Sequence, residues 1–123
     1  MSNNTHISFY LSSYRIHIFR ETIQAIGTPG YVRFLVNREA GSMILQACGR
    51  KTPTSHKVVT DCTGGMEIKS FPFCSVLAKE MNWNDMFSYR IPGQTFPDQH
   101  IAVFDLTGAE PIGRNDEMKE AEF

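Results

Sequence analysis

The chain has 123 residues, of which 41% are hydrophobic and 20% charged, and its formal net charge is −1. This length fits one domain that buries most of its surface on folding. The composition excludes a disordered chain. No apolar run is long enough to span a bilayer, and the N-terminus has no secretory signal pattern. The three cysteines lack a CxxC spacing, which predicts reduced thiols in a cytoplasmic protein.

Charge is distributed unevenly along the chain. Residues 1–52 carry six basic and two acidic groups, a balance of +4. The balance is −2 over residues 53–107 and −3 over residues 108–123. This asymmetry predicts a basic surface on the first half of the fold and is compatible with a polar partner there, although many proteins without such a partner share it.

The first half of the chain begins with two predicted strands and a helix. Apolar and polar residues alternate over residues 7–12 and again over residues 14–18, the pattern of half-buried strands. Apolar residues at i, i+4 and i+7 from Phe19 predict a short helix. Gly27 is placed where a left-handed residue would end that helix.

A predicted β-hairpin follows the helix. Alternation resumes over residues 32–36, and residues 43–48 supply a partner strand. Between them, residues 37–42 are polar and contain a glycine, which is typical of a hairpin loop. The polar residues 49–56 then read as a linker.

The second half repeats this order. Strands are predicted over residues 57–60 and 66–69, with a glycine-containing turn at residues 61–65 between them. Pro72 is typical of the first turn of a helix, and apolar residues at i, i+4 and i+8 from Phe73 give that helix its buried stripe.

The end of the chain supplies a second hairpin and a tail. Alternation predicts a strand over residues 87–91, a turn over residues 92–100 and a last strand over residues 101–106. Trp83, just after the helix, is expected to fill the core. Residues 108–123 are acidic and poor in apolar residues, so we expect a loose tail or a short terminal helix there.

Two runs with the same order of elements predict a single α+β domain. We expect residues 7–48 and 57–106 to be half-units that close one small β-barrel together, with residues 1–107 as the domain. Neither half-unit is large enough to close its own core. The alternative is that the repeat is accidental, since many α+β chains can be divided into two strand-helix-hairpin pieces.

The first half-unit resembles the swapped-hairpin barrel proteins of the AbrB, MazE and MraZ type. Arg15-Ile16 matches an Arg-Ile position of that pattern, Arg20-Glu21 the start of its helix, Ala25-Ile26-Gly27 the end of the helix, and Pro29-Gly30 its Pro-Gly turn. The resemblance covers residues 7–48 well and residues 57–106 loosely, and two units in one chain are similar to the MraZ arrangement. It implies a module like those of transcription regulators.

The chain departs from this pattern at three places. Ser13-Tyr14 stands where a glycine usually precedes the arginine, and residues 17–19 lack the proline of the pattern. Glu67 stands at the arginine position of the second half-unit. The resemblance therefore implies DNA contact through the first half-unit alone.

Four arginines are the candidate DNA-binding residues: Arg15, Arg20, Arg33 and Arg38. On one face they would contact phosphates, with Arg15 best placed for a base edge. Four are few for tight binding by one chain, so we expect a homo-oligomer that repeats the basic face. Alternatively, they are solvated surface residues, and the protein is a protein-interaction or oligomerisation module, antitoxin-like, that binds no nucleic acid.

No motif indicates an enzyme, a metal site or a cofactor. The histidines and cysteines lack metal-finger spacing, with His56 and Cys62 the nearest approach to a pair. Cys62, on a glycine turn, is the only candidate nucleophile. The chain has neither a P-loop nor a GxGxxG motif. The sequence thus predicts a binding module with no cofactor.

Overall fold

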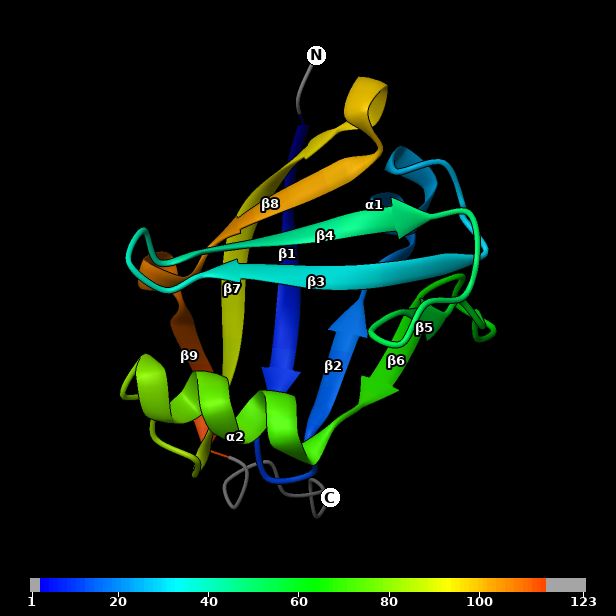
Figure 1. Ribbon diagram of the computed structural model, residues 1–123. Helices are drawn as coiled ribbons and strands as arrows, with labels where there is room; N and C mark the ends of the chain where they lie inside the picture. The colour runs from blue at the N-terminus through cyan, green and yellow to red at the C-terminus, as the bar shows by residue number, and fades with distance from the viewer. Residues whose placement is uncertain (1–2, 115–123) are drawn as a thin grey trace, which may run out of the picture.

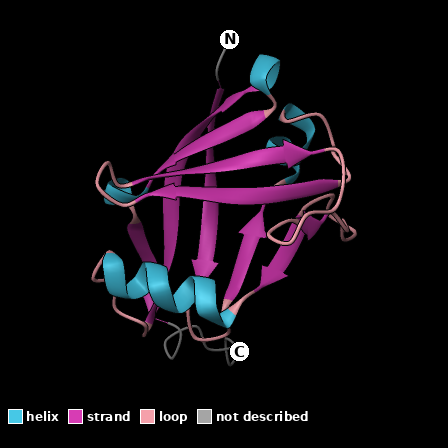
Figure 2. Cartoon of the chain, viewed as in Figure 1, coloured by secondary structure: helices cyan, strands magenta, loops and turns pink. Residues whose placement is uncertain are grey.

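Strands make up most of the regular secondary structure, as the alternating sequence predicts. The computed structural model describes residues 3–114 (Figures 1 and 2). Its strands are β1 (Asn3–Tyr10), β2 (Arg15–Ile18), β3 (Tyr31–Asn37), β4 (Ser42–Cys48), β5 (His56–Lys57), β6 (Met66–Lys69), β7 (Phe87–Phe96), β8 (Ile101–Asp105) and β9 (Glu110–Arg114). The helices are α1 (Arg20–Ala25) and α2 (Phe71–Glu80), with short 3-10 turns η1 (Pro97–Gln99) and η2 (Leu106–Gly108).

The strands form one nearly closed antiparallel sheet. Its order is β5-β3-β4-β8-β7-β1-β2-β6, and β9 pairs with the first part of β7. Pairs of strands from the two halves of the chain interleave in this order, because β1 pairs with β7, β2 with β6, β3 with β5 and β4 with β8. The expected α+β barrel is therefore confirmed, with its open seam between β5 and β6.

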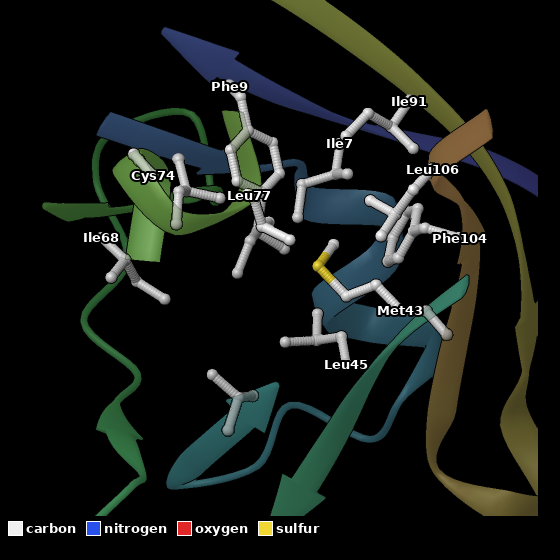
Figure 3. Close-up of a cluster of buried hydrophobic side chains, with 14 of the residues drawn as sticks. Ile7, Phe9, Met43, Leu45, Ile68, Cys74, Leu77, Ile91, Phe104 and Leu106 are labelled. Atoms are coloured by element: carbon white, nitrogen blue, oxygen red, sulfur yellow. The ribbon is translucent and has the colours of Figure 1, made fainter. Parts of the chain in front are cut away.

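The core lies between two walls of the barrel. In Figure 1, β3 and β4 cross the front while β1, β2 and β7 run transversely behind them. Inward-facing side chains from both walls meet in the space between, among them Ile7, Phe9, Leu45 and Phe104, all of which are fully buried (Figure 3). Burial of each such side chain contributes about 1.5–3 kcal/mol.

Each helix is bounded as its sequence predicts. Gly27, at φ 97°, follows α1 in the left-handed region. The Ser70 hydroxyl accepts a hydrogen bond from the Phe73 N–H and caps α2, which carries Pro72 in its first turn. Cys74 and Leu77 face the core from α2, which covers the lower end of the barrel in Figure 1.

Trp83 follows α2 and is partly buried against the core. Its ring stacks on Tyr89, with centroids 5.1 Å apart, and meets the Phe9 ring edge-on at 5.7 Å. Such aromatic pairs add about 0.5–1.5 kcal/mol beyond the area they bury.

Three sequence expectations need correction. The strand expected over residues 57–60 is replaced by the short β5, His56–Lys57, although the Val58 N–H still donates to the carbonyl of Gly30, the residue opposite it in the β3–β5 register. Residues 92–96, expected in a turn, continue β7. On one side of β7, Pro92 lies where the partner changes from β9 to β8, so its missing N–H interrupts neither ladder there, and on the other side it pairs with His6 of β1.

The third correction concerns the end of the chain. Part of the expected tail, Glu110–Arg114, forms β9 and pairs with β7, so the sheet continues beyond residue 107. Residues 115–123 lie outside the described part. Within residues 3–114, no helix combines the length and the apolar character needed to cross a membrane.

Candidate functional site

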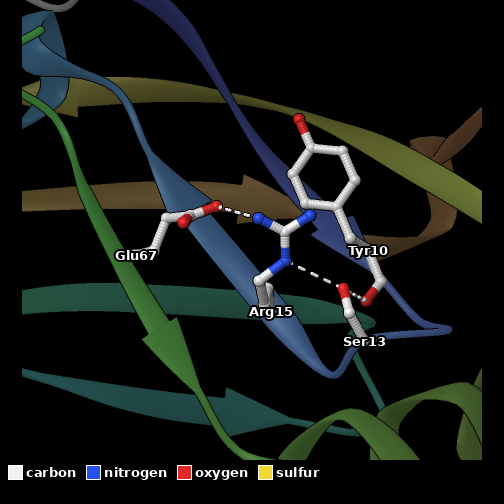
Figure 4. Close-up of polar contacts among 4 residues, drawn as sticks. All are labelled: Tyr10, Ser13, Arg15 and Glu67. Carbon is white, nitrogen blue, oxygen red and sulfur yellow. Dashed lines mark hydrogen bonds and ion pairs between the residues drawn. The ribbon is translucent and has the colours of Figure 1, made fainter. Parts of the chain in front are cut away.

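Arg15 begins β2 and points away from the core. Its Nη1 donates to Glu67 Oε2 on β6 at 2.9 Å, and its Nε donates to the Ser13 hydroxyl at 2.8 Å (Figure 4). The guanidinium also lies over the Tyr10 ring, 5.1 Å from its centroid. The side chains of Arg15 and Glu67 are 44% and 40% exposed, so the pair is solvent-screened and contributes about 0–1 kcal/mol.

The other three candidate arginines also have polar partners. Arg20, at the start of α1, lies 3.6 Å from the Glu21 carboxylate. The Nε of Arg33, on β3, donates to the Gln46 side chain at 2.7 Å. Arg38, in the hairpin between β3 and β4, lies 3.3 Å from Glu80 at the end of α2.

The structure does not gather the four arginines on one face. Arg15 and Arg20 lie at the two ends of β2. Arg33 points outward from β3, because its neighbour Val32 is fully buried. Figure 4 looks onto the outside of β2 and β6 with β3 and β4 behind them, so Arg15 and Arg33 occupy different walls. The single basic face expected from the sequence is therefore divided between different walls of the barrel.

The wall that carries Arg15 is polar on its outer side. We call the outward residues of β1, β2 and β6 the polar wall: His6, Ser8, Tyr10, Arg15, His17, Glu67 and Lys69. Arg90, outward on β7, extends it beside Ser8. Inward apolar and outward polar residues alternate along β2, along β6 and over residues 7–10 of β1, the pattern of an antiparallel sheet with one face in the core, and Ser8 is itself buried.

The opposite wall has apolar residues on its outer side. Leu35 on β3, Ile44 on β4 and Val103 on β8 face each other in register and form what we call the outer apolar row. Leu35 is 41% exposed, and the other two are half-buried. Ile101, two residues before Val103, adds a fourth apolar side chain to this face. In Figure 1, no described element lies in front of β3 and β4.

A groove continues the outer apolar row towards β7. Its volume is about 750 Å³, and its lining includes Val103, Gln94, Phe96 and Gly93. Gly93 pairs with Phe104 of β8 and leaves no room for a side chain there, since an added Cβ would lie 2.5 Å from the buried Phe104 ring. The apolar surface thus extends over four neighbouring strands.

A second hollow, of about 540 Å³, lies beside α2. Tyr14 and Phe71 form its apolar side and pack edge to face with ring centroids 4.6 Å apart. Lys79 and Asp85 contribute charge to the rest of its lining. Phe71 is still 57% exposed and Tyr14 37%, so this hollow also carries exposed apolar surface, but on two contacting rings and not on a run of neighbouring strands.

The cysteines and histidines do not form a reactive cluster. Cys62 is exposed in the turn before β6, whereas the His56 ring packs on Phe34 with centroids 6.0 Å apart. Burial raises the pKa of the Cys74 thiol to about 11. Over residues 3–114, no three His, Cys, Asp or Glu side chains group as metal ligands would.

Two sets of surface residues were missed from the sequence. Lys69 and Arg90 join Arg15 only because β6 and β7 flank the first two strands. The outer apolar row had a visible signal, since β8 reads IAVFD and carries apolar residues on both faces. Continuous apolar runs are typical of strands covered on both sides.

Comparison with known proteins identifies no relative. No protein-family model, curated protein sequence or solved structure matches the chain.

Proposed function

We propose that this protein acts by binding another protein chain, without catalysis, through the outer face of β3, β4 and β8. The outer apolar row carries the proposal. Single exposed hydrophobic residues are ordinary on protein surfaces. Leu35, Ile44 and Val103 are instead contiguous, across three strands of one sheet.

The opposite wall of the same barrel is an internal control. The outward positions of its three strands, β1, β2 and β6, are all polar or aromatic-polar. If water surrounded the whole barrel, every wall would be expected to carry polar residues on its outer side. The difference between the walls supports a partner on one side.

The fold itself is best explained as two half-units that exchange strands, as in the swapped-hairpin barrels. Exchanging β1 with β5, β2 with β6, β3 with β7 and β4 with β8 converts the pair β1–β7 into β5–β3, and both pairs are present. Ile16 and Ile68, which hold matching positions in the two sequence runs, are register partners. The β1–β2 pair lacks its counterpart, because β5 and β6 end the sheet.

A photo-crosslinking experiment tests protein binding by this face. A benzoylphenylalanine is placed at position 44 on the outer apolar row and, as the matched control, at position 17 on the polar wall. In the cells that make the protein, irradiation should give a discrete cross-linked species from position 44 only. No species from position 44, or the same species from both positions, would contradict the proposal.

DNA binding is the second candidate function. Arg15, Arg20, Lys69 and Arg90 lie on or beside the polar wall, and residues of this kind contact phosphates. Glu21 and Glu67 pair with the two arginines, which weakens this candidate relative to the first.

Titration of duplex DNA at two salt concentrations tests this second function. A protein that neutralises phosphates must lose affinity steeply as salt rises, and Arg15→Ala should reduce both the affinity and the salt slope. The Lys79→Ala variant, which removes a basic residue of α2, is the matched control. Absence of binding at low salt rules the DNA function out.

A further inference from the structure

The outer face of β3, β4 and β8 has a charge pattern that complements itself. Among the outward residues of these three strands, only Arg33 and Asp105 are charged. Arg33 precedes Leu35 by two residues on β3, and Asp105 follows Val103 by two residues on β8. The two charged residues therefore lie at diagonally opposite corners of this face, on either side of the outer apolar row. Their charges cancel, so the face has no net charge.

We infer that a second copy of this chain covers the face, forming a two-fold symmetric dimer; this inference rests on the proposed protein-binding function. Two identical faces of zero net charge do not repel each other, and the positive corner of one copy can meet the negative corner of the other. Two-fold dimers use the same patch on both subunits, which requires such self-complementarity.

The Arg33 guanidinium and the Asp105 carboxylate can each form a further hydrogen bond with the second copy. Arg33 donates its Nε to Gln46, and a guanidinium has four further N–H donors. Asp105 accepts two hydrogen bonds from Thr107, both at Oδ1, which leaves its Oδ2 as an acceptor for the partner. An arginine–carboxylate contact at the edge of an apolar face fixes register more than it adds affinity.

Ile44 marks the position of the two-fold axis. It lies on the central strand of the three, between Leu35 and Val103, so an axis through it packs the two Ile44 side chains against each other. The two-fold axis must also place Arg33 of one copy beside Asp105 of the other. With the axis in that direction, the strands of one sheet cross those of the other at a steep angle, as in orthogonal sheet packing.

The size of the face predicts a weak dimer. Three neighbouring strands of five to seven residues cover about 15 Å by 20 Å, or about 300 Å², at ordinary strand spacing and rise. Stable interfaces bury about 800 Å² on each partner. We therefore expect a dimer that dissociates on dilution.

Sedimentation velocity over a wide range of concentrations tests the dimer. The purified wild-type chain should shift from one to two copies as concentration rises. Ile44→Glu should abolish the shift, whereas His17→Glu, the matched change on the polar wall, should not. Urea unfolding of both variants establishes that each remains folded. A wild-type chain that stays monomeric throughout overturns the inference.

A charge swap and a cross-link make the test specific to this geometry. Arg33→Asp should weaken the dimer at least tenfold, and adding Asp105→Arg should restore it. Because Asp105 also holds Thr107, a second measurement avoids that residue. With Cys48 and Cys62 replaced by serine, Ile44→Cys should be joined to its copy by a short bis-maleimide, and His17→Cys should not.

The outcomes separate this inference from the proposed function. Position 44 cross-linking to a different protein in cells, with a purified chain that remains monomeric, retains the protein-binding function and overturns the second copy as the partner. Absence of any cross-link from position 44 overturns both.

Discussion

The guanidinium of Arg15 lies 2.9 Å from the carboxylate of Glu67, and the two residues hold matching positions in the two sequence runs. At the position where the first run has an arginine, the second has a glutamate, and pairing of β2 with β6 brings the two positions together. The glutamate of the second run therefore supplies a partner for the arginine at the matching position of the first.

A double-mutant cycle measures this pair. Arg15→Ala, Glu67→Ala and the double variant should give a coupling free energy below about 1 kcal/mol in urea unfolding, because both side chains are exposed. The coupling should shrink at high salt. A coupling above about 2 kcal/mol would show that the pair is shielded from water in solution. Leu35→Ala, on the other wall, should show no coupling to either change.

The alternation of apolar and polar residues predicted most of the strands, because a strand with one buried face has that pattern. Ile16 and Ile18, for example, point inward from β2 as their spacing requires. The prediction failed at Pro92, read as a turn residue, because only the partners of β7 show that its N–H is not needed. It failed again at β9, a strand of the sequence EPIGR whose one strongly apolar residue gives no alternation.

The candidate site was less predictable than the fold. The arginine positions were read correctly as strand and turn residues, but the wall on which each one lies depends on strand order. Arg15 and Arg33 are separated because β2 and β3, close in sequence, lie far apart in that order. Pairing between distant strands is a long-range property that local spacing does not encode.

Gly93 is predicted to be a position that tolerates no side chain. An added Cβ would lie 2.5 Å from both the Phe104 Cδ1 and the Val103 carbonyl oxygen. Phe104 is fully buried and cannot move aside. Gly93→Ala should therefore lower the free energy of unfolding by about 1–3 kcal/mol, as overpacking does. Gly49→Ala, which meets nothing within 4 Å, should change it by less than about 0.5 kcal/mol in either direction.

The three cysteines should react with a thiol reagent at different rates. Cys62 is exposed, Cys48 half-buried and Cys74 buried with its pKa raised to about 11. Since only the thiolate reacts, the Cys62 thiol should be labelled rapidly at pH 7.5. The Cys74 thiol should be labelled only after the protein is unfolded in urea. Cys62→Ser should remove the rapid phase. Labelling of Cys74 at the rate of Cys62 would mean that α2 opens from the barrel.

Two histidines should make the protein less stable as the pH falls below neutral. Burial lowers the pKa of His56, and burial together with the nearby charge of Arg90 lowers the pKa of His6. Above the unfolded value of about 6.5, both are neutral in either state, and their stabilising effect is complete. Below it, the unfolded chain takes up protons more readily than the folded chain, so the free energy of unfolding decreases.

Urea unfolding between pH 7.5 and pH 5 measures this dependence, in a range where the carboxylates titrate little. Each histidine should contribute a slope below about 1.4 kcal/mol per pH unit, and His56→Gln and His6→Gln should each flatten the profile. The contribution of His56 should persist in 0.5 M salt, because burial and not a neighbouring charge lowers its pKa. A free energy of unfolding that stays constant or rises towards pH 5 would show that both rings are solvated in the folded protein.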